Sequence, residues 1–250
     1  MTVAPLLEIA GVTVKFGVNR ALTAVDLQVP AGEVVGLIGP NGAGKTTLFN
    51  VVTGQQRASS GQVLFDGRDI SRLDTHHRAQ RGIGRTFQRL ELFGDLSVAD
   101  NLRVAGEIRN RWRLFGVRRH IDVSARAEHV LDVLGLTALA DVGACDVPTG
   151  TARLVELGRA LMAQPRLLLL DEPASGQTES ETEAFGRLLR RLAEEEGTTV
   201  LLVEHDMALV MEVCDRVHVL DFGEVIAHGT PDEVQQDARV LEAYLGAPGA

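Results

Sequence analysis

One glycine-rich segment constrains this chain more than any other feature. Residues 39–47 read Gly-Pro-Asn-Gly-Ala-Gly-Lys-Thr-Thr, after the apolar run Val34–Ile38 and before a helix-forming segment. The apolar run is typical of a buried parallel strand, so the glycine-rich segment is predicted to turn from that strand into a helix. Its pattern G-x-x-x-x-G-K-[ST] indicates a phosphate-binding loop, because glycines let successive N–H groups face phosphate oxygens at a helix N-terminus. We therefore expect a nucleoside-triphosphate site at this turn.

Three side chains at the end of this loop have predicted roles in binding. Lys45 is one of only two lysines in the chain, and its compact ammonium is expected on the β- and γ-phosphates. The Thr46 hydroxyl is expected to coordinate Mg²⁺, and Thr47 adds a second hydroxyl. The predicted cofactors are thus ATP and Mg²⁺. The predicted nucleotide contacts in the loop are Gly39, Pro40, Asn41, Gly42, Ala43, Gly44, Lys45, Thr46 and Thr47.

Two carboxylates after a later apolar run, 167–170, extend the predicted site. Asp171 is expected to hold the hydration shell of Mg²⁺, and Glu172 to polarise the water that attacks the γ-phosphorus. His205 follows the next apolar run, 199–203, where an imidazole could contact the γ-phosphate. Taken alone, the carboxylates could be a solvated strand end and the histidine a structural residue. The presence of the phosphate-binding loop favours a catalytic role for the two carboxylates. The position of His205 after a third predicted strand favours a functional role for that residue.

Composition limits the class of protein. With 250 residues, 45 % of them hydrophobic, the chain can bury one substantial core or a core with a small subdomain. It has no apolar stretch of the roughly 20 residues that a membrane helix needs and no signal-peptide pattern at its start, so we expect a cytoplasmic protein. The net charge of −9 argues against a nucleic-acid partner. Cys145 and Cys214 are expected to be reduced structural thiols, because neither lies in a CxxC or Cys/His cluster.

Apolar runs and helical patterns alternate along the chain as in an α/β domain. Helices are expected at 179–196 and 232–245, and residues 97–163 are mostly helical in pattern, with interruptions near glycines. This long segment is a candidate helical subdomain. Strands are expected at 6–9, 12–16, 22–29, 63–65, 83–88, 167–170, 199–203, 217–220 and 225–227, the last two as a hairpin.

Together these residues resemble the ATP-binding cassette (ABC) ATPases. The phosphate-binding loop matches the Walker A motif of that family, residues 167–171 match Walker B, Glu172 matches the catalytic glutamate and His205 the switch histidine. The resemblance implies that Gln88 is the Q-loop glutamine, a catalytic residue that contacts Mg²⁺. It also implies that Phe16 stacks on the adenine.

The resemblance covers almost the whole chain, about residues 7–245, and implies its organisation. A single ABC ATPase domain, 1–250, is expected to have an α/β P-loop NTPase fold. In that fold a mixed sheet combines a parallel core with antiparallel N-terminal strands. A helical subdomain at about 89–163 would lie between the Q-loop and Walker B, and 231–250 would form a C-terminal helical tail.

Short stretches narrow the resemblance to the ATPases of branched-chain amino-acid importers. These are residues 82–88, 92–93 and 96–102, and the closing Ala-Tyr-Leu-Gly at 243–246. The implied partners are a second ABC ATPase subunit, identical or not, integral-membrane permease subunits and, indirectly, an extracytoplasmic solute-binding protein. The implied location is the cytoplasmic face of the cell membrane. The cargo would be branched-chain or other amino acids, or similar small polar solutes, chosen elsewhere in the complex.

A long insert after Asn101 also fits these importers. It is arginine-rich, and its arginines are expected to form a solvated helix face, with contact to a permease or to lipid headgroups as the alternative. The residues concerned are Arg109, Arg111, Trp112, Arg113, Arg118 and Arg119.

Two motifs depart from the family pattern. In place of the signature LSGGQ the chain has Val-Pro-Thr-Gly-Thr at 147–151, and Thr178 stands where the D-loop usually has an aspartate. In the family the signature begins a helix that binds the γ-phosphate held by the partner subunit, so Thr149, Gly150 and Thr151 remain predicted nucleotide contacts. The departures keep two alternatives open beside a transporter ATPase. One is a soluble ABC ATPase of assembly or repair, and the other is a weakly hydrolysing regulatory subunit.

Overall fold

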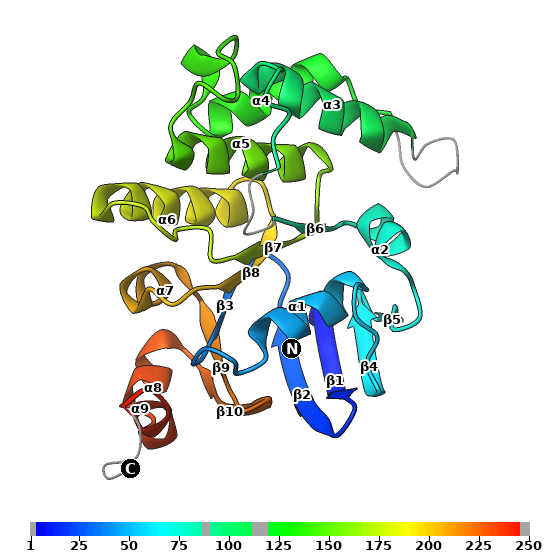
Figure 1. Cartoon of the computed structure of the whole chain (residues 1–250), viewed down its shortest axis with the longest axis vertical. Coiled ribbons are helices and arrows are strands. Elements are labelled where there is room, and N and C mark those ends of the chain that lie inside the picture. The colour runs from blue at the N-terminus through cyan, green and yellow to red at the C-terminus, as the bar shows by residue number, and fades with distance from the viewer. Residues whose placement is uncertain (1–3, 87–90, 112–119, 246–250) are drawn as a thin grey trace.

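The computed structural model describes residues 4–86, 91–111 and 120–245, which form two sheets with helices packed around them (Figure 1). The larger sheet has the order β10-β9-β3-β8-β7-β6, and the smaller sheet has the order β2-β1-β4-β5. The N-terminal strands therefore form a sheet of their own within the predicted α/β arrangement. The larger sheet contains β3 (Val34–Ile38), β6 (Ile83–Arg85), β7 (Leu167–Asp171), β8 (Thr199–Val203), β9 (Arg216–Asp221) and β10 (Glu224–Gly229).

Three parallel strands form the buried centre of the larger sheet. Every residue of β3, β7 and β8 is buried, as expected for strands covered on both faces. Strand β8 pairs with β3 on one side and with β7 on the other, always in parallel. The carboxyl ends of the three strands therefore meet at one edge of the sheet, and the predicted site residues follow them there.

The smaller sheet is antiparallel and contains β1 (Leu7–Phe16), β2 (Asn19–Val29), β4 (Ser60–Phe65) and β5 (Arg68–Asp69). The prediction of two strands at 6–9 and 12–16 is wrong, because β1 is continuous. Its pairing with β2 shifts between Ile9 and Val12, where Gly11 has φ +58°. Such a bulge breaks the alternation of buried and exposed residues that sequence patterns rely on.

The helices of the described residues cover the larger sheet and extend beyond it (Figure 1). Helix α6 confirms the prediction for 179–196, and α3, α4 and α5 confirm the helical character of 97–163. The predicted C-terminal helix is two helices, because the chain is extended at Asp237. The bounds are α1 (Lys45–Thr53), α2 (Thr75–Arg81), α3 (Val98–Arg111), α4 (Val123–Val133), α5 (Thr149–Met162), α6 (Glu179–Glu194), α7 (Met207–Val213), α8 (Pro231–Gln236) and α9 (Ala238–Leu245), with a 3₁₀ turn at Thr137–Leu139.

The larger sheet separates two hydrophobic clusters. Side chains alternate between the two faces of a strand, so neighbouring leucines of β7 enter different clusters. Leu168 and Leu170 pack with residues of helices α3 to α7, whereas Leu167 and Leu169 pack with α1 and the smaller sheet. The sheet is therefore anchored on both faces, which holds its carboxyl edge in a fixed place.

Part of the arginine-rich insert can be placed. Arg109 is buried and donates a hydrogen bond to Gln164 Oε1 at 2.7 Å, so the prediction of a solvated face is wrong for this residue. Arg111 is exposed. Trp112, Arg113, Arg118 and Arg119 lie outside the described residues. Within the described ranges, every helix falls short of the length and apolarity needed to span a bilayer.

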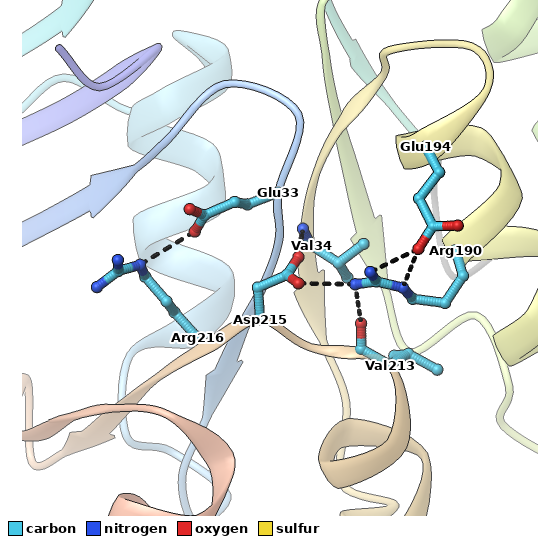
Figure 2. Close-up of polar contacts among 7 residues, drawn as sticks. All are labelled: Glu33, Val34, Arg190, Glu194, Val213, Asp215 and Arg216. Carbon is cyan, nitrogen blue, oxygen red and sulfur yellow. Dashed lines mark hydrogen bonds and ion pairs between the residues drawn. The ribbon is translucent and has the colours of Figure 1, made fainter. Parts of the chain in front are cut away.

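A cluster of polar contacts connects helix α6 to the start of β3, at the end of the strand opposite the phosphate-binding loop (Figure 2). Arg190 of α6 donates to Asp215 Oδ1 at 2.8 Å and to the carbonyl oxygen of Val213 at 3.3 Å. The other oxygen of Asp215 accepts the main-chain N–H of Val34 at 2.8 Å. Because Val34 begins β3, Asp215 connects helix α6 to the first residue of the central strand.

Substitution of Asp215 tests how much the connection between α6 and the start of β3 contributes to stability. We expect Asp215→Ala to lower the free energy of unfolding by about 1–2 kcal/mol, because the Val34 N–H loses its acceptor and Arg190 loses a partner. Asp215→Asn keeps an oxygen acceptor, and should cost less than the alanine variant. Urea unfolding followed by circular dichroism measures both values. Equal losses in the two variants would show that the Val34 hydrogen bond contributes nothing.

Candidate active site

The glycine-rich loop has the backbone that its sequence predicts. Gly39, Gly42 and Gly44 have φ of +146°, +83° and +110°, a region that residues with a Cβ rarely adopt. Helix α1 begins directly after Gly44, and no side chain in the described part of the chain caps its first turn. The N–H groups of that turn are the positive end of the helix dipole, so this end is suited to an anion.

Lys45 lies inside this loop and near two carboxylates. Its side chain is buried, and Nζ donates to the carbonyl oxygens of Gly39 at 2.6 Å and Pro40 at 2.9 Å. Burial lowers the pKa of Lys45, while the negative charges of Glu172 and Asp171 oppose that change. The structure thus brings together the cation and both carboxylates that the sequence assigns to phosphate chemistry.

The rest of the predicted loop contacts differ in exposure. Asn41, Gly42 and Thr46 are exposed, so their polar groups are open to a ligand. Pro40, Gly44 and Thr47 are half-buried, and Ala43 is buried. Phe16 is 53 % exposed at the end of β1, where an aromatic ring is available for stacking.

Asp171 and Glu172 are placed at the carboxyl edge by strand register. Asp171 is the last residue of β7 and pairs with Val203 of β8, which also pairs with Leu37 of β3. Glu172 follows with φ +49°, a left-handed conformation that is uncommon for a residue with a side chain, and its N–H donates to the Val203 carbonyl. Strain of this kind clusters at functional sites, where surrounding structure holds it in place.

His205 is exposed, and the residue before it fixes its position. Glu204 is buried, and its two oxygens accept the main-chain N–H groups of Ala174 at 2.8 Å and His205 at 3.2 Å. Burial raises the pKa of Glu204, while the hydrogen bonds it accepts oppose that change. Glu204 therefore ties the loop after Glu172 to the loop that carries His205. Sequence reasoning missed this role, although a carboxylate directly after the apolar run 200–203 was a visible signal.

Arg85 is a second residue that sequence reasoning missed. Its side chain is 9 % exposed and forms a 2.9 Å ion pair with Asp171, whose side chain is 3 % exposed. The same guanidinium donates to Asn50 Oδ1 of α1 at 2.6 Å and to Gln55 Oε1 at 3.0 Å. Burial raises the pKa of Asp171, and the charge of Arg85 opposes this, so Arg85 stabilises the ionised carboxylate.

The remaining predicted residues are not part of this cluster. Thr149, Gly150 and Thr151 form the start of α5, and Gly150 and Thr151 line a separate cavity of about 500 Å³ with residues of α6. The next turn of α5 connects them to the site, because Arg153 donates to the carbonyl oxygens of Glu172 and Pro173, both at 3.2 Å. Gln88 lies outside the described residues.

Hard oxygen donors at the edge fit a magnesium ion. Asp171 and the exposed Thr46 supply a carboxylate and a hydroxyl near the loop, and Mg²⁺ prefers one or two carboxylates completed by water and substrate phosphates. The described residues contain no group of three or more histidine, cysteine or acidic side chains arranged as a metal site. A carboxylate and a hydroxyl are donors that suit a metal completed by water and by the phosphates of a nucleotide.

Comparisons with known proteins agree with this geometry. A family model described as ABC transporter matches residues 22–175, and one described as Branched-chain amino acid ATP-binding cassette transporter matches residues 224–250. The high-affinity branched-chain amino acid transport ATP-binding protein BraF of Pseudomonas aeruginosa is 39 % identical over 250 residues, covering 97 % of this chain and 98 % of that protein.

Solved structures show the same fold. An ATP-binding cassette of an ABC transporter in its ADP conformation is similar at a TM-score of 0.86 and 32 % identity, covering 97 % of this chain and 99 % of that one. A dimeric ATP-binding cassette in a post-hydrolysis state, bound to ADP and Pi, is similar at a TM-score of 0.76 and 27 % identity, covering 90 % of this chain and 98 % of that one. The predicted P-loop NTPase fold is thereby confirmed.

The buried Arg85–Asp171 pair gives a second test. Arg85→Met should lower the free energy of unfolding by about 3 kcal/mol, because it leaves the Asp171 carboxylate buried without its main partner. Arg103→Met is the matched control: Arg103 forms an exposed ion pair with Asp100, and its loss should cost less than about 1 kcal/mol. Urea unfolding measures both. Similar losses would contradict the stabilising role of Arg85.

Proposed function

The chain belongs to the ABC transporter ATPases, as the family model and the 39 % sequence identity to BraF show. On that premise, we propose that it powers a membrane importer of amino acids. The observation that carries the proposal is the meeting of Lys45, Asp171 and Glu172 beside the N-terminus of α1. The match of residues 224–250 to the branched-chain amino acid transporter model supports branched-chain or similar amino acids as cargo.

ATP would bind with its phosphates at the start of α1. Lys45 would exchange the two carbonyl acceptors it now has for oxygens of the β- and γ-phosphates, and N–H groups of the loop and of the first turn of α1 would bind the remaining charge. Phe16 would stack on the adenine from the β1–β2 hairpin. The proposed contacts of the first site are therefore residues 39–47 and Phe16.

Asp171 and Thr46 are the proposed holders of Mg²⁺, which neutralises phosphate charge when bound. Arg85 favours this role because its charge stabilises the ionised form of the Asp171 carboxylate and its hydrogen bond orients the carboxylate through Oδ2. Gln88 is proposed as a further contact from outside the described residues.

Glu172 is the proposed general base. It would orient a water molecule and accept its proton as that water attacks the γ-phosphorus, a role typically worth about 10²- to 10⁴-fold in rate. Its left-handed backbone and the hydrogen bond from its N–H to Val203 hold it at the strand end. His205 would contact the γ-phosphate from the neighbouring loop.

A second ATPase subunit is the proposed partner at the nucleotide. The start of α5, with Thr149, Gly150 and Thr151, would contact the γ-phosphate held by that subunit, and the dimeric cassette to which this chain is similar supports such pairing. Integral-membrane permeases would bind the pair at the cytoplasmic face of the membrane, with residues 89–163 as a helical subdomain. An extracytoplasmic solute-binding protein would deliver the cargo.

Two substitutions separate binding from hydrolysis. Lys45→Ala should weaken ATP affinity about 10- to 100-fold, because charged hydrogen bonds to phosphate are lost. Glu172→Gln should keep wild-type affinity while turnover falls about 10²- to 10⁴-fold. Glu179→Gln, an exposed carboxylate at the start of α6, is the matched control and should behave as wild type. Nucleotide titration and a phosphate-release assay measure these effects, and normal turnover by Glu172→Gln would overturn the assignment of the base.

The transport role needs the assembled complex. The chain should co-purify from membranes with integral-membrane partners, and amino-acid uptake into vesicles containing the complex should require ATP and be lost with Glu172→Gln. Recovery without membrane partners would instead favour a soluble assembly or repair ATPase. Tight ATP binding without turnover by the complex would favour a regulatory subunit.

A further inference from the structure

A cavity separate from the phosphate-binding loop lies where three helices meet. Its volume is about 500 Å³, and it is lined by the end of α4, the start of α5 and one face of α6. Figure 1 shows α5 between α4 and α6. Ala184, Arg187 and Arg191 of α6 line the cavity and are exposed, so a small molecule has access to it from solvent.

The inner wall of this cavity is apolar. Leu134 of α4 and two residues of α6, Phe185 and Leu188, line it and belong to the larger hydrophobic cluster. Leu154 of α5 also lines the cavity and packs against that cluster. Because apolar groups gain free energy when they leave water for such a wall, the cavity suits a ligand with an apolar body.

Two arginines give the cavity positive charge. Arg187 and Arg191 lie one helical turn apart on α6. Arg187 has a long ion pair, 3.8 Å, with Glu183, and both side chains of that pair are exposed, so the pair is weak. Arg191 forms no side-chain hydrogen bond or ion pair with the residues that the structure describes. Both guanidinium groups are therefore available to a carboxylate, the anion that their paired N–H groups match.

Hydrogen-bond acceptors line the cavity near the start of α6. Glu181 Oε2 accepts the main-chain N–H of Thr178 at 2.8 Å and its hydroxyl at 2.9 Å, and these bonds lower the pKa of Glu181, so the carboxylate is ionised. The side-chain oxygen of Gln177 is buried and has no hydrogen-bond partner in the described part of the chain. The Gln177 amide can thus turn toward a ligand donor without losing a bond to its oxygen. These groups suit a cation.

The two charged parts of the cavity are close enough to bind one small molecule. Glu181 and Arg187 are six residues apart, about 9 Å along the helix axis. Side chains of a helix lean toward its N-terminus, so the Arg187 guanidinium extends back toward Glu181. The ion pair of Arg187 with Glu183, a residue on its N-terminal side, agrees with this direction.

We propose that this cavity binds a small apolar α-amino acid. Its side chain packs on the apolar wall, its carboxylate binds Arg187 and Arg191, and its ammonium group binds Glu181. An aliphatic acid would leave Glu181 and Gln177 without a cationic partner, and an aliphatic amine would leave both arginines without an anion. A zwitterion with an apolar side chain satisfies both parts and the wall at once.

The ligand class follows from the cavity alone, whereas its regulatory meaning rests on the proposed function. Amino acids of this class are the proposed cargo, and Thr151 of the predicted signature segment lines the same cavity. An occupied cavity would therefore couple the concentration of imported cargo to the helix that is proposed to contact the nucleotide of the partner subunit.

The direct test is calorimetric titration of L-leucine into the full chain without nucleotide. We expect one saturable site and a higher melting temperature with leucine, because the ligand binds only the folded chain. L-Leucinamide lacks the carboxylate, 4-methylpentanoate lacks the ammonium group and L-alanine lacks most of the apolar side chain. Each should bind at least about tenfold more weakly than leucine, since each loses one of the three contacts.

Substitutions locate the binding in this cavity. Arg187→Gln and Arg191→Gln should each weaken leucine binding about tenfold, as loss of a charged hydrogen bond predicts. Arg103→Gln, at an exposed arginine of α3 outside the cavity, is the matched control and should bind as wild type. Ala184→Trp should abolish binding because the indole fills the cavity, whereas Glu128→Trp, at an exposed position of α4 outside it, should not.

Three results would overturn the inference. They are the absence of saturable leucine binding to the wild-type chain, equal binding of leucine and 4-methylpentanoate, and unchanged leucine binding in both Arg191→Gln and Ala184→Trp. The ligand series needs no variant, so it tests the site even where a substitution disturbs folding.

The outcome is separable from the transport proposal, because leucine binding needs no ATP, turnover or membrane partner. Leucine binding by a chain that never assembles with permeases would defeat the proposed function alone. A complex that imports amino acids although its ATPase binds no leucine would defeat only the role of the cavity.

Discussion

Parallel pairing of three buried strands is the constraint on which the candidate site depends. Strands β3, β8 and β7 share one direction and a fixed register, so the residues that follow each strand emerge at one edge. Lys45, Glu172 and His205 come from three distant parts of the sequence and reach this edge for that reason alone. The strands can be almost entirely apolar because both faces are covered, which leaves their carboxyl ends as the place for charged groups.

Charged groups at this edge are buried only together with partners. Lys45 has two carbonyl acceptors and two nearby carboxylates, Asp171 has Arg85, and Glu204 accepts two main-chain N–H groups. An unpaired buried charge would cost several kcal/mol, so each of these contacts restricts where its partner can lie. The same contacts that make burial tolerable therefore orient the groups assigned to phosphate chemistry.

The sequence predicted the parts of this arrangement that local pattern encodes. The glycine-rich loop, the apolar strands and the carboxylates at 171 and 172 are each visible within a few residues. The contacts from Arg85 to Asp171 and from Glu204 to Ala174 were not predictable, because they join residues that only the fold brings together. Helices α2 and α7 were missed because seven residues are too few to show a helical period, and the break at Asp237 left the hydrophobic pattern of 232–245 intact.

One arginine side chain connects the proposed catalytic glutamate to the helices that pack beyond the sheet. Arg153 of α5 donates to the carbonyl oxygens of Glu172 and Pro173, so a shift in the backbone of the proposed base lengthens these bonds unless the Arg153 side chain or α5 moves with it. Glu172 is held in an uncommon backbone conformation, which persists only where the surrounding contacts maintain it. Helix α5 also packs against α3 and α4, so it connects the edge of the sheet to the helices beyond it. Residues 147–151, which are predicted to be the signature segment, lead into that same helix, so Arg153 connects their helix to the backbone of Glu172.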